Sequence, residues 1–281
     1  MTTILLDAFD VDRARAMVLA PNGLGRLERA AVDGATLGGI FELACTYVAW
    51  RQTHPAAARL AEKWAAPSEI ASETLARLAG AHPRPSTERI GVEIAPIECA
   101  EDLIGSHGTA LQQRFKHMLT TNGFPLPLAQ ALTGAFAEMA DNIVQHSGNE
   151  EGKPAPGIWG YHVEQQWVSF AVADIGRGVL KSLRTNSRHA HVQDGASALE
   201  AAVTNGATRR TNQASGGGFS TLHRALANLN GILRFRSDTA CLVLDGCSNE
   251  RKATTTNSSD LHGLQLSVIC ALRPPFGARK L

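Results

Sequence analysis

Apolar residues recur at helical spacing near the middle of the chain. Five of them follow one another at intervals of three or four residues: Leu128, Leu132, Phe136, Met139 and Ile143. That spacing places them along one side of a helix. Pro127 suits the first turn of such a helix, and Gly148 suits its C-terminal cap. The pattern therefore predicts an amphipathic helix over residues 128–147.

Alternating apolar and polar positions surround this helix. Strands are expected over residues 90–94, 158–163, 167–173, 232–236, 241–244 and 264–272. The short segment from Glu164 to Gln166 joins the second and third of these as a hairpin. A second amphipathic helix is expected over 219–229, ending at Asn230 and Gly231. This order of elements predicts an α+β fold, a two-layer α/β sandwich with a mixed sheet and its helices on one face.

The first third of the chain has a different texture. Residues 33–80 are rich in Ala, Leu, Glu and Arg, and they are broken at Pro55, at Pro67 and from Gly80 to Pro85, so helices are expected. We place a domain boundary near residue 88. A mainly helical N-terminal region over 1–88, with docking or homodimerisation as its expected role, precedes a second domain over 89–281. The Ser-, Thr- and Asn-rich stretch from Cys247 to Asp260 is expected to be a surface loop.

Charge and cysteine content limit the classes of binding partner and the cellular compartment that we expect. The 281 residues include 27 Lys and Arg against 26 Asp and Glu, a net charge of +1, so no basic excess predicts nucleic acid or a membrane surface as partner. Five cysteines without a C-x-x-C pair argue against a disulfide framework or a zinc ribbon. Acidic residues near the N-terminus do not suit a signal peptide, and a cytoplasmic location is expected.

Three short motifs carry candidate chemistry. Glu138 and Asn142 lie one turn apart on the flank of the predicted helix, where a carboxylate can align a water and an amide oxygen can ligate a hard cation. Two solvated polar residues are the simpler interpretation of that pair. The segment from Asp174 to Gly178, D-I-G-R-G, follows a strand and offers an acceptor beside a close-approaching backbone. A plain turn is its simpler interpretation.

The third motif is a run of glycines before the predicted helix over 219–229. Gly216, Gly217 and Gly218 would expose backbone N–H groups at the positive end of that helix, where phosphate binds. A flexible loop is the alternative. No G-K-[ST] follows, so this is not a Walker A loop, and no strand precedes it, so it is not a Rossmann fingerprint.

The order and spacing of these motifs resemble the GHKL superfamily of ATP-binding domains, which includes gyrase, histidine-kinase ATPase domains and the anti-sigma-factor serine kinases. The segment from Glu138 to Ser147 looks like the N box, Asp174 to Gly178 like the first glycine box, and Gly216 to Gly218 like the second. The resemblance covers roughly residues 110 to 273. It implies a Bergerat-type ATP-binding fold with ATP and Mg²⁺ as cofactors.

The resemblance also implies roles for single residues. Asn142 would ligate magnesium, and Glu138 would orient or deprotonate the nucleophile. Asp174 would accept a hydrogen bond from the adenine amino group. Gly176 and Gly178 would let the base lie close to the backbone. Gly216, Gly217 and Gly218 would present N–H groups to the phosphates, and residues 179–215 would form a lid.

Departures from the family pattern bear on the activity. Gln145 stands where histidine kinases usually carry a basic residue, and no H-E-x-x-[NT]-P phosphoacceptor precedes it, so a self-contained histidine kinase is not expected. Glu138 favours the hydrolases and the anti-sigma-type serine kinases. The expected function is Mg-ATP binding with hydrolysis or transfer of the γ-phosphate to a partner protein. The alternatives are a nucleotide-gated interaction module without turnover and a protein that binds no nucleotide.

Overall fold

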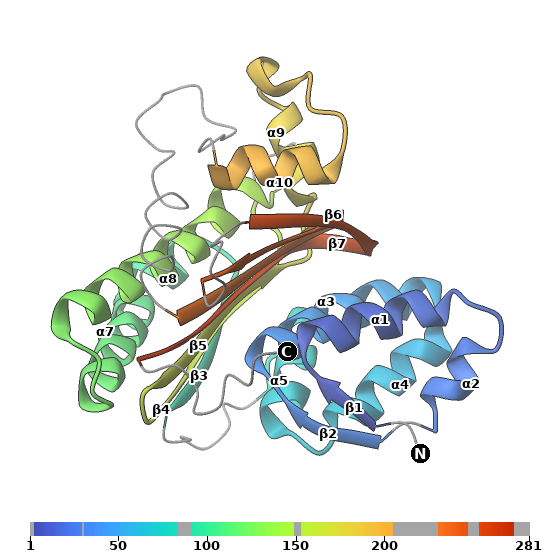
Figure 1. Cartoon of the computed structure of the whole chain (residues 1–281), viewed down its shortest axis with the longest axis horizontal. Helices are drawn as coiled ribbons and strands as arrows, with labels where there is room; N and C mark the ends of the chain where they lie inside the picture. The colour runs from blue at the N-terminus through green and yellow to red at the C-terminus, as the bar shows by residue number, and fades with distance from the viewer. Residues whose placement is uncertain are drawn as a thin grey trace.

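The computed structural model describes residues 3–29, 31–83, 91–148, 153–204, 230–246 and 253–272. In these residues a five-stranded sheet lies between two layers of helices (Figure 1). The helices that follow the first strand of this sheet in the chain cover one face, and the N-terminal helices cover the other. The protein is therefore a mixed α+β structure whose described part has three layers.

The N-terminal layer contains five helices and a small sheet. Its elements are β1 (Thr3–Leu6), α1 (Ala8–Val18), α2 (Gly23–Leu27), β2 (Ala31–Ala35), α3 (Leu37–Thr53), α4 (Pro55–Ala65) and α5 (Glu69–Leu78). Pro55 opens α4, and Pro67 lies in the break before α5, where breaks were expected. The parallel pair of β1 and β2 was not expected. The predicted boundary near residue 88 lies outside the described residues, between α5 and the first strand of the large sheet.

The large sheet has the strand order β3-β4-β5-β7-β6. Its strands are β3 (Val92–Ile97), β4 (Gly157–Glu164), β5 (Trp167–Asp174), β6 (Asn230–Asp245) and β7 (Ala253–Ala271). The predicted hairpin of β4 and β5 is present, with Gln166 at a positive φ of 59° in its turn. All four strand pairs are antiparallel, so the expectation of a mixed sheet is wrong for the described strands.

Strands β6 and β7 differ from the predicted elements. The two short strands expected over 232–236 and 241–244 are one strand, β6, which is bent by register shifts around Asp238. The surface loop expected from Cys247 to Asp260 is wrong for residues 253–260, which belong to β7. Thr254, Thr255 and Thr256 pair with β6, because β-branched residues suit a strand even where the chain is polar.

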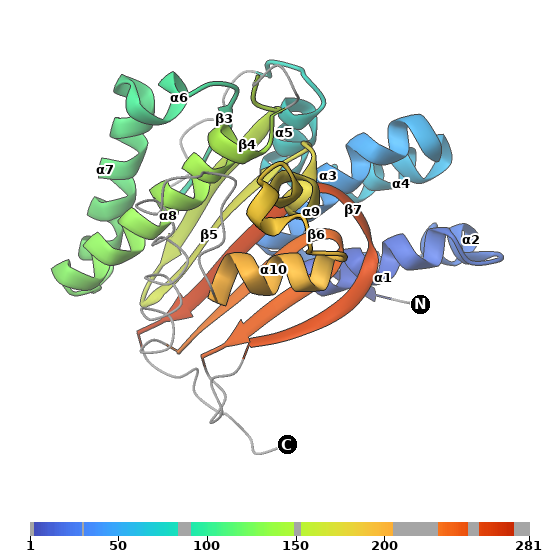
Figure 2. The ribbon, with the colours of Figure 1, turned by 90° about the horizontal axis from the view of Figure 1, so that it is seen from above.

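The second layer of helices packs on the aromatic face of the sheet. It comprises α6 (Glu101–Ile104), α7 (Ser106–Thr121), α8 (Leu126–His146), α9 (Gly178–Arg184), the short 3₁₀ helix η1 (Ser187–His189) and α10 (Gly195–Thr204). Figure 2 shows α8 lying along β5 and α10 lying over β6. The apolar stripe predicted for α8 is buried from Leu132 to Ile143 and half-buried at Leu128, and Phe136 stacks on Trp159 of β4 at 4.9 Å. This face holds the main hydrophobic core.

The opposite face of the sheet meets α3. Ile158, Ala171 and Ala173 alternate with the aromatic positions of β4 and β5, and they pack in the hydrophobic core of the N-terminal layer. Gly38 of α3 sits so close that a Cβ there would lie 2.8 Å from Ser267 Oγ of β7. Helices therefore cover both faces of the sheet. Those described after β3 lie on one face, and the N-terminal layer, which was expected as a separate region, covers the other.

Candidate functional site

Asp174 is a buried carboxylate at the end of a central strand. It pairs in register with Gly157 of β4 and Leu264 of β7, and it is 3 % exposed. Its Oδ1 accepts a hydrogen bond from the Gly176 N–H at 2.7 Å, and no hydrogen bond from the described residues reaches Oδ2. Burial raises the pKa of Asp174 to about 7, against the opposing effect of the Gly176 N–H. The carboxylate is thus an acceptor that titrates near neutral pH.

The two glycines after Asp174 are required by the protein's own packing. A Cβ on Gly176 would collide with the Ser147 carbonyl oxygen and would lie 2.9 Å from Asp174 Oδ1. Gly178 has φ +78°, and a Cβ there would lie 2.9 Å from Asp238 Oδ1. The sequence assigned both glycines to close approach of a ligand. In the structure the protein itself occupies this space. Gly176 packs against Ser147 at the end of α8, and Gly178 packs against Asp238 of β6.

Ser147, directly after α8, joins that helix to the Asp174 loop. Its carbonyl oxygen accepts the Arg177 N–H at 3.2 Å. Its hydroxyl donates to the Ile143 carbonyl at 2.6 Å and accepts the Ala155 N–H at 3.0 Å. Since Ser147 is buried, these bonds fix the loop that carries Asp174 relative to the C-terminal end of α8.

Glu138 and Asn142 lie one turn apart on α8, as predicted. Asn142 is half-buried, and its Nδ2 donates to the Glu138 carbonyl at 2.9 Å, which leaves Oδ1 as the amide's acceptor. Glu138 is exposed. Partial burial and the nearby Asp141 carboxylate raise its pKa. No hydrogen bond within the described residues joins either side chain to Asp174; the two motifs meet through the backbone at Ser147.

Three residues of β6 and β7 shape the same loop and were missed by the sequence analysis. Ser237 Oγ accepts the Val179 N–H at 2.9 Å and donates to the Gly263 carbonyl at 2.8 Å. Asp238 Oδ2 accepts the Leu180 N–H at 3.3 Å. Gly263 has φ +89° and packs on the Asp174 carbonyl. No local motif marks these residues, because they reach the loop only through strand pairing.

Cationic side chains near the loop have different roles. Arg177 Nη2 is buried and has no hydrogen-bond partner among the described residues, so this guanidinium retains a donor for an anion. Arg184 is occupied, because it donates to the Val192 and Gln193 carbonyls at 2.8 and 2.9 Å. Gly216, Gly217 and Gly218 lie outside the described residues, as do residues 205–215 of the lid expected over 179–215 and the helix expected over 219–229. The described part of the expected lid, residues 179–204, contains α9, η1 and α10.

The described residues suit some ligands and not others. They contain no group of three or more His, Cys, Asp or Glu side chains placed to hold a metal ion. A single amide oxygen at Asn142 fits magnesium only where phosphates and waters supply the other ligands. Within the same residues, no helix has the length and apolar character needed to cross a bilayer. No protein-family model matches the chain, and a search of the curated proteins finds no match.

Proposed function

We propose that residues 89–281 bind Mg-ATP in a GHKL-type pocket and hydrolyse it or transfer its γ-phosphate to a partner protein. One observation carries the proposal: a buried carboxylate, Asp174, ends a central strand in a loop bonded to the end of the helix that presents Glu138 and Asn142. A buried carboxylate is costly unless something uses it. The Bergerat-type fold and the superfamily are parts of the same proposal.

Each side chain has a chemical task under this proposal. Asp174 Oδ2 accepts a hydrogen bond from an exocyclic amino group, as a fixed acceptor in a water-poor site. Asn142 Oδ1 provides a hard oxygen ligand, and bound magnesium would neutralise phosphate charge. Glu138, with its raised pKa, is suited to take a proton from the nucleophile. Gly216, Gly217 and Gly218 remain the proposed phosphate donors.

The runner-up function is a nucleotide-gated interaction module without turnover. One observation favours it: the Glu138 side chain is exposed and makes no hydrogen bond with the described residues. No hydrogen bond from the described residues therefore fixes the orientation of this carboxylate. Under this alternative, ATP binding shifts the population of a lid conformation that a partner recognises.

The two functions separate in an assay with γ-labelled ATP. Purified protein, Glu138→Gln and the control Glu98→Gln are incubated with magnesium, and bound nucleotide, released phosphate and label on protein are scored together. Glu98 is an exposed carboxylate outside the proposed site. Phosphate release or labelling lost only in Glu138→Gln supports catalysis. Binding without either in all three proteins favours the gated module, and no binding contradicts both.

A further inference from the structure

A distortion in β6 aims two side chains at the Asp174 loop. The register of β6 against β7 shifts between Ser237 and Asp238 and again between Asp238 and Ala240, and Asp238 has a positive φ of 51°. Such a bulge redirects side chains and is costly unless its surroundings hold it. Here it allows Ser237 and Asp238 to accept the N–H groups of Val179 and Leu180.

Arg236 spans this bulge from the other face of the sheet. Its guanidinium is fully buried, and Nη1 donates to the Ala240 carbonyl at 2.7 Å. Nη2 donates to the Ser259 carbonyl of β7 at 2.5 Å. One planar group thus bonds to the backbone of both strands where their regular pairing is interrupted.

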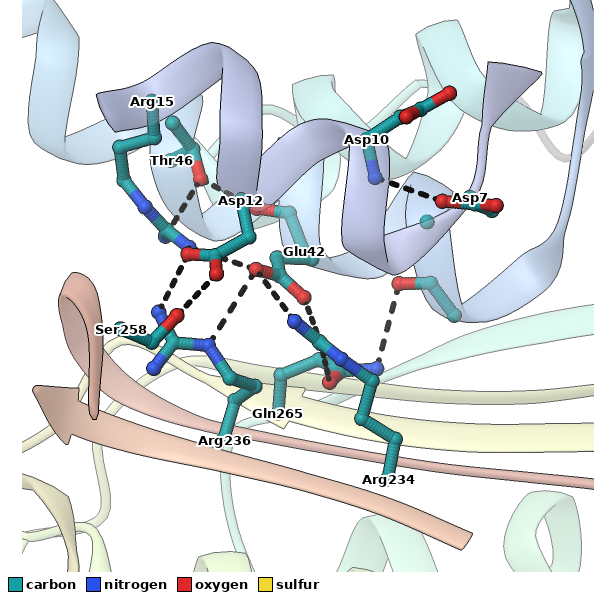
Figure 3. Close-up of polar contacts among 12 residues, drawn as sticks. Asp7, Asp10, Asp12, Arg15, Glu42, Thr46, Arg234, Arg236, Ser258 and Gln265 are labelled. Atoms are coloured by element: carbon teal, nitrogen blue, oxygen red, sulfur yellow. Dashed lines mark hydrogen bonds and ion pairs between the residues drawn. The ribbon is translucent and has the colours of Figure 1, made fainter. Parts of the chain in front are cut away.

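The N-terminal layer supplies the charges that hold Arg236 in place. Asp12 Oδ1 of α1 lies 3.1 Å from Arg236 Nη2, and Glu42 Oε1 of α3 lies 3.6 Å from Arg236 Nε (Figure 3). Glu42 is fully buried and also pairs with Arg15 and Arg234. A buried guanidinium keeps a single position only when carboxylates compensate its charge. Figure 3 shows these side chains converging between α1, α3 and the strands.

These contacts form one continuous path. It starts at Glu42 and Asp12, passes through Arg236 into the bulge, and leaves through Ser237 and Asp238 to the first turn of α9. The same turn follows directly on the Asp174 loop. A second contact runs beside it, since Cys45 Sγ of α3 lies 3.7 Å from the Asp174 carbonyl oxygen.

We propose that Arg236 is a positioning residue, through which Glu42 and Asp12 of the N-terminal layer fix the geometry of the loop from Asp174 to Leu180. The N-terminal layer is then an internal part of the site and not a separate docking module. The inference that this geometry serves ATP rests on the proposed function; the positioning itself does not. Full affinity for the nucleotide then requires an intact N-terminal layer, although none of the residues proposed to contact the nucleotide lies in that layer.

Arg234 provides a matched control. It is also buried and also pairs with Glu42, but it stands in the regular register opposite Ser267, before the bulge. Arg236→Met and Arg234→Met therefore disturb the same ionic cluster, and only the first removes the bonds across the bulge. Ser237→Ala removes the acceptor of the Val179 N–H without touching the cluster, and it shows how much exchange the loss of that bond alone causes. Arg236→Lys serves if Arg236→Met does not fold.

The experiment measures amide hydrogen exchange at Val179 and Leu180 in nucleotide-free protein, together with the Kd for Mg-ATP and the stability of each full-length variant. We expect Arg236→Met to speed exchange at these two amides about tenfold and to weaken ATP binding by about the same factor. Arg234→Met should change both by less than about threefold at a similar loss of stability. Arg236→Lys keeps the charge but not the two-way donor geometry and should fall between them.

Every outcome bears on the inference. Selectively faster exchange at Val179 and Leu180 in Arg236→Met, or in Arg236→Lys if Arg236→Met does not fold, supports the positioning role. Unchanged exchange in a folded variant overturns it, as does an equal effect of Arg234→Met, which would show that only overall stability is transmitted. The wild-type protein could also fail to bind ATP while Arg236→Met still shows selectively faster exchange at Val179 and Leu180. That result would support the positioning role and contradict the proposed function.

Discussion

The sheet meets α7 and α8 through aromatic rings, whereas it meets α3 through alanines, a glycine and an ionic cluster. On the first face Phe136 lies 5.1 Å from Phe115 and 4.9 Å from Trp159. On the second face Glu42 is fully buried among three arginines. Apolar packing is non-directional and tolerates exchange of similar side chains, while paired charges specify a geometry. The first face therefore supplies stability, and the second supplies position.

The largest contrast between the faces is expected from substitutions that conserve shape. Glu42→Gln keeps the size of the side chain and removes its charge, which leaves buried guanidinium groups uncompensated. We expect a loss of about 3 kcal/mol in the free energy of unfolding. Met139→Leu on the aromatic face keeps both volume and polarity and should cost less than about 1.5 kcal/mol. Chemical denaturation of both variants checks this, and equal losses would remove the distinction.

Glycines of the two helices give the next test. Gly38→Ala would place a methyl group 2.8 Å from Ser267 Oγ and should destabilise the protein by about 1–3 kcal/mol, because α3 must move off the sheet. Gly134 of α8 has no atom within 4 Å of the equivalent position. Gly134→Ala should therefore stabilise by up to about 1 kcal/mol, since alanine is the better helix former. Thermal unfolding that showed the same sign for both would contradict the close fit of α3.

The buried carboxyl of Asp174, at the end of β5, predicts that the stability of the protein depends on pH. Because burial raises its pKa to about 7, the folded protein holds this proton more tightly than the unfolded chain does. Its contribution to stability should therefore fall as pH rises from about 4 to about 7, by up to about 1.4 kcal/mol per pH unit, and then level off. Unfolding measured across this range should show that slope in wild type and lack it in Asp174→Asn. Parallel curves would mean that the carboxyl is not perturbed.

The smallest effect on stability is expected at Asn142. Its side chain is half-buried on the flank of α8, so Asn142→Ala should change the free energy of unfolding by less than about 0.5 kcal/mol. The same change should remove the magnesium dependence of nucleotide binding, because the amide oxygen is the proposed ligand. Titrations with and without a chelator measure this. A variant that keeps the wild-type response to chelator would show that Asn142 does not bind the metal.

Local periodicity predicted the helix that packs on the aromatic face of the sheet, but it did not predict the ionic cluster on the opposite face. The stripe from Leu128 to Ile143 and the hairpin around Gln166 follow from patterns within a few turns of chain. Arg234 and Arg236 alternate with Leu233 and Phe235 in the same way, but their partner Glu42 is 192 residues from Arg234 in sequence. The one sequence feature that indicates this cluster is Glu42, a charged residue within the apolar segment of α3. Its meaning depends on long-range packing, which no local pattern contains.

The candidate site divides in the same manner. The order of motifs indicated Asp174, Gly176 and Gly178, and the structure joins them to the end of α8. Ser237 and Asp238 were missed because a bulge, and not a sequence motif, aims them at the loop. The polar segment over 253–260 was taken for a loop, yet Ser258 and Ser259 bond to Asp12. Although burial opposes it, those bonds and Arg236 lower the pKa of Asp12 to about 2.

The central claim is that Asp174 accepts a hydrogen bond from the base of a bound nucleotide. Calorimetric titration with Mg-ATP tests it most directly. Wild type, Asp174→Asn and the control Glu98→Gln, at an exposed carboxylate outside the proposed site, are compared at pH 8. We predict binding by wild type and by the control, and affinity lower by about 1.5–3 kcal/mol, roughly ten- to a hundredfold, in Asp174→Asn. Equal affinity in all three proteins, or no binding by wild type, would contradict the account.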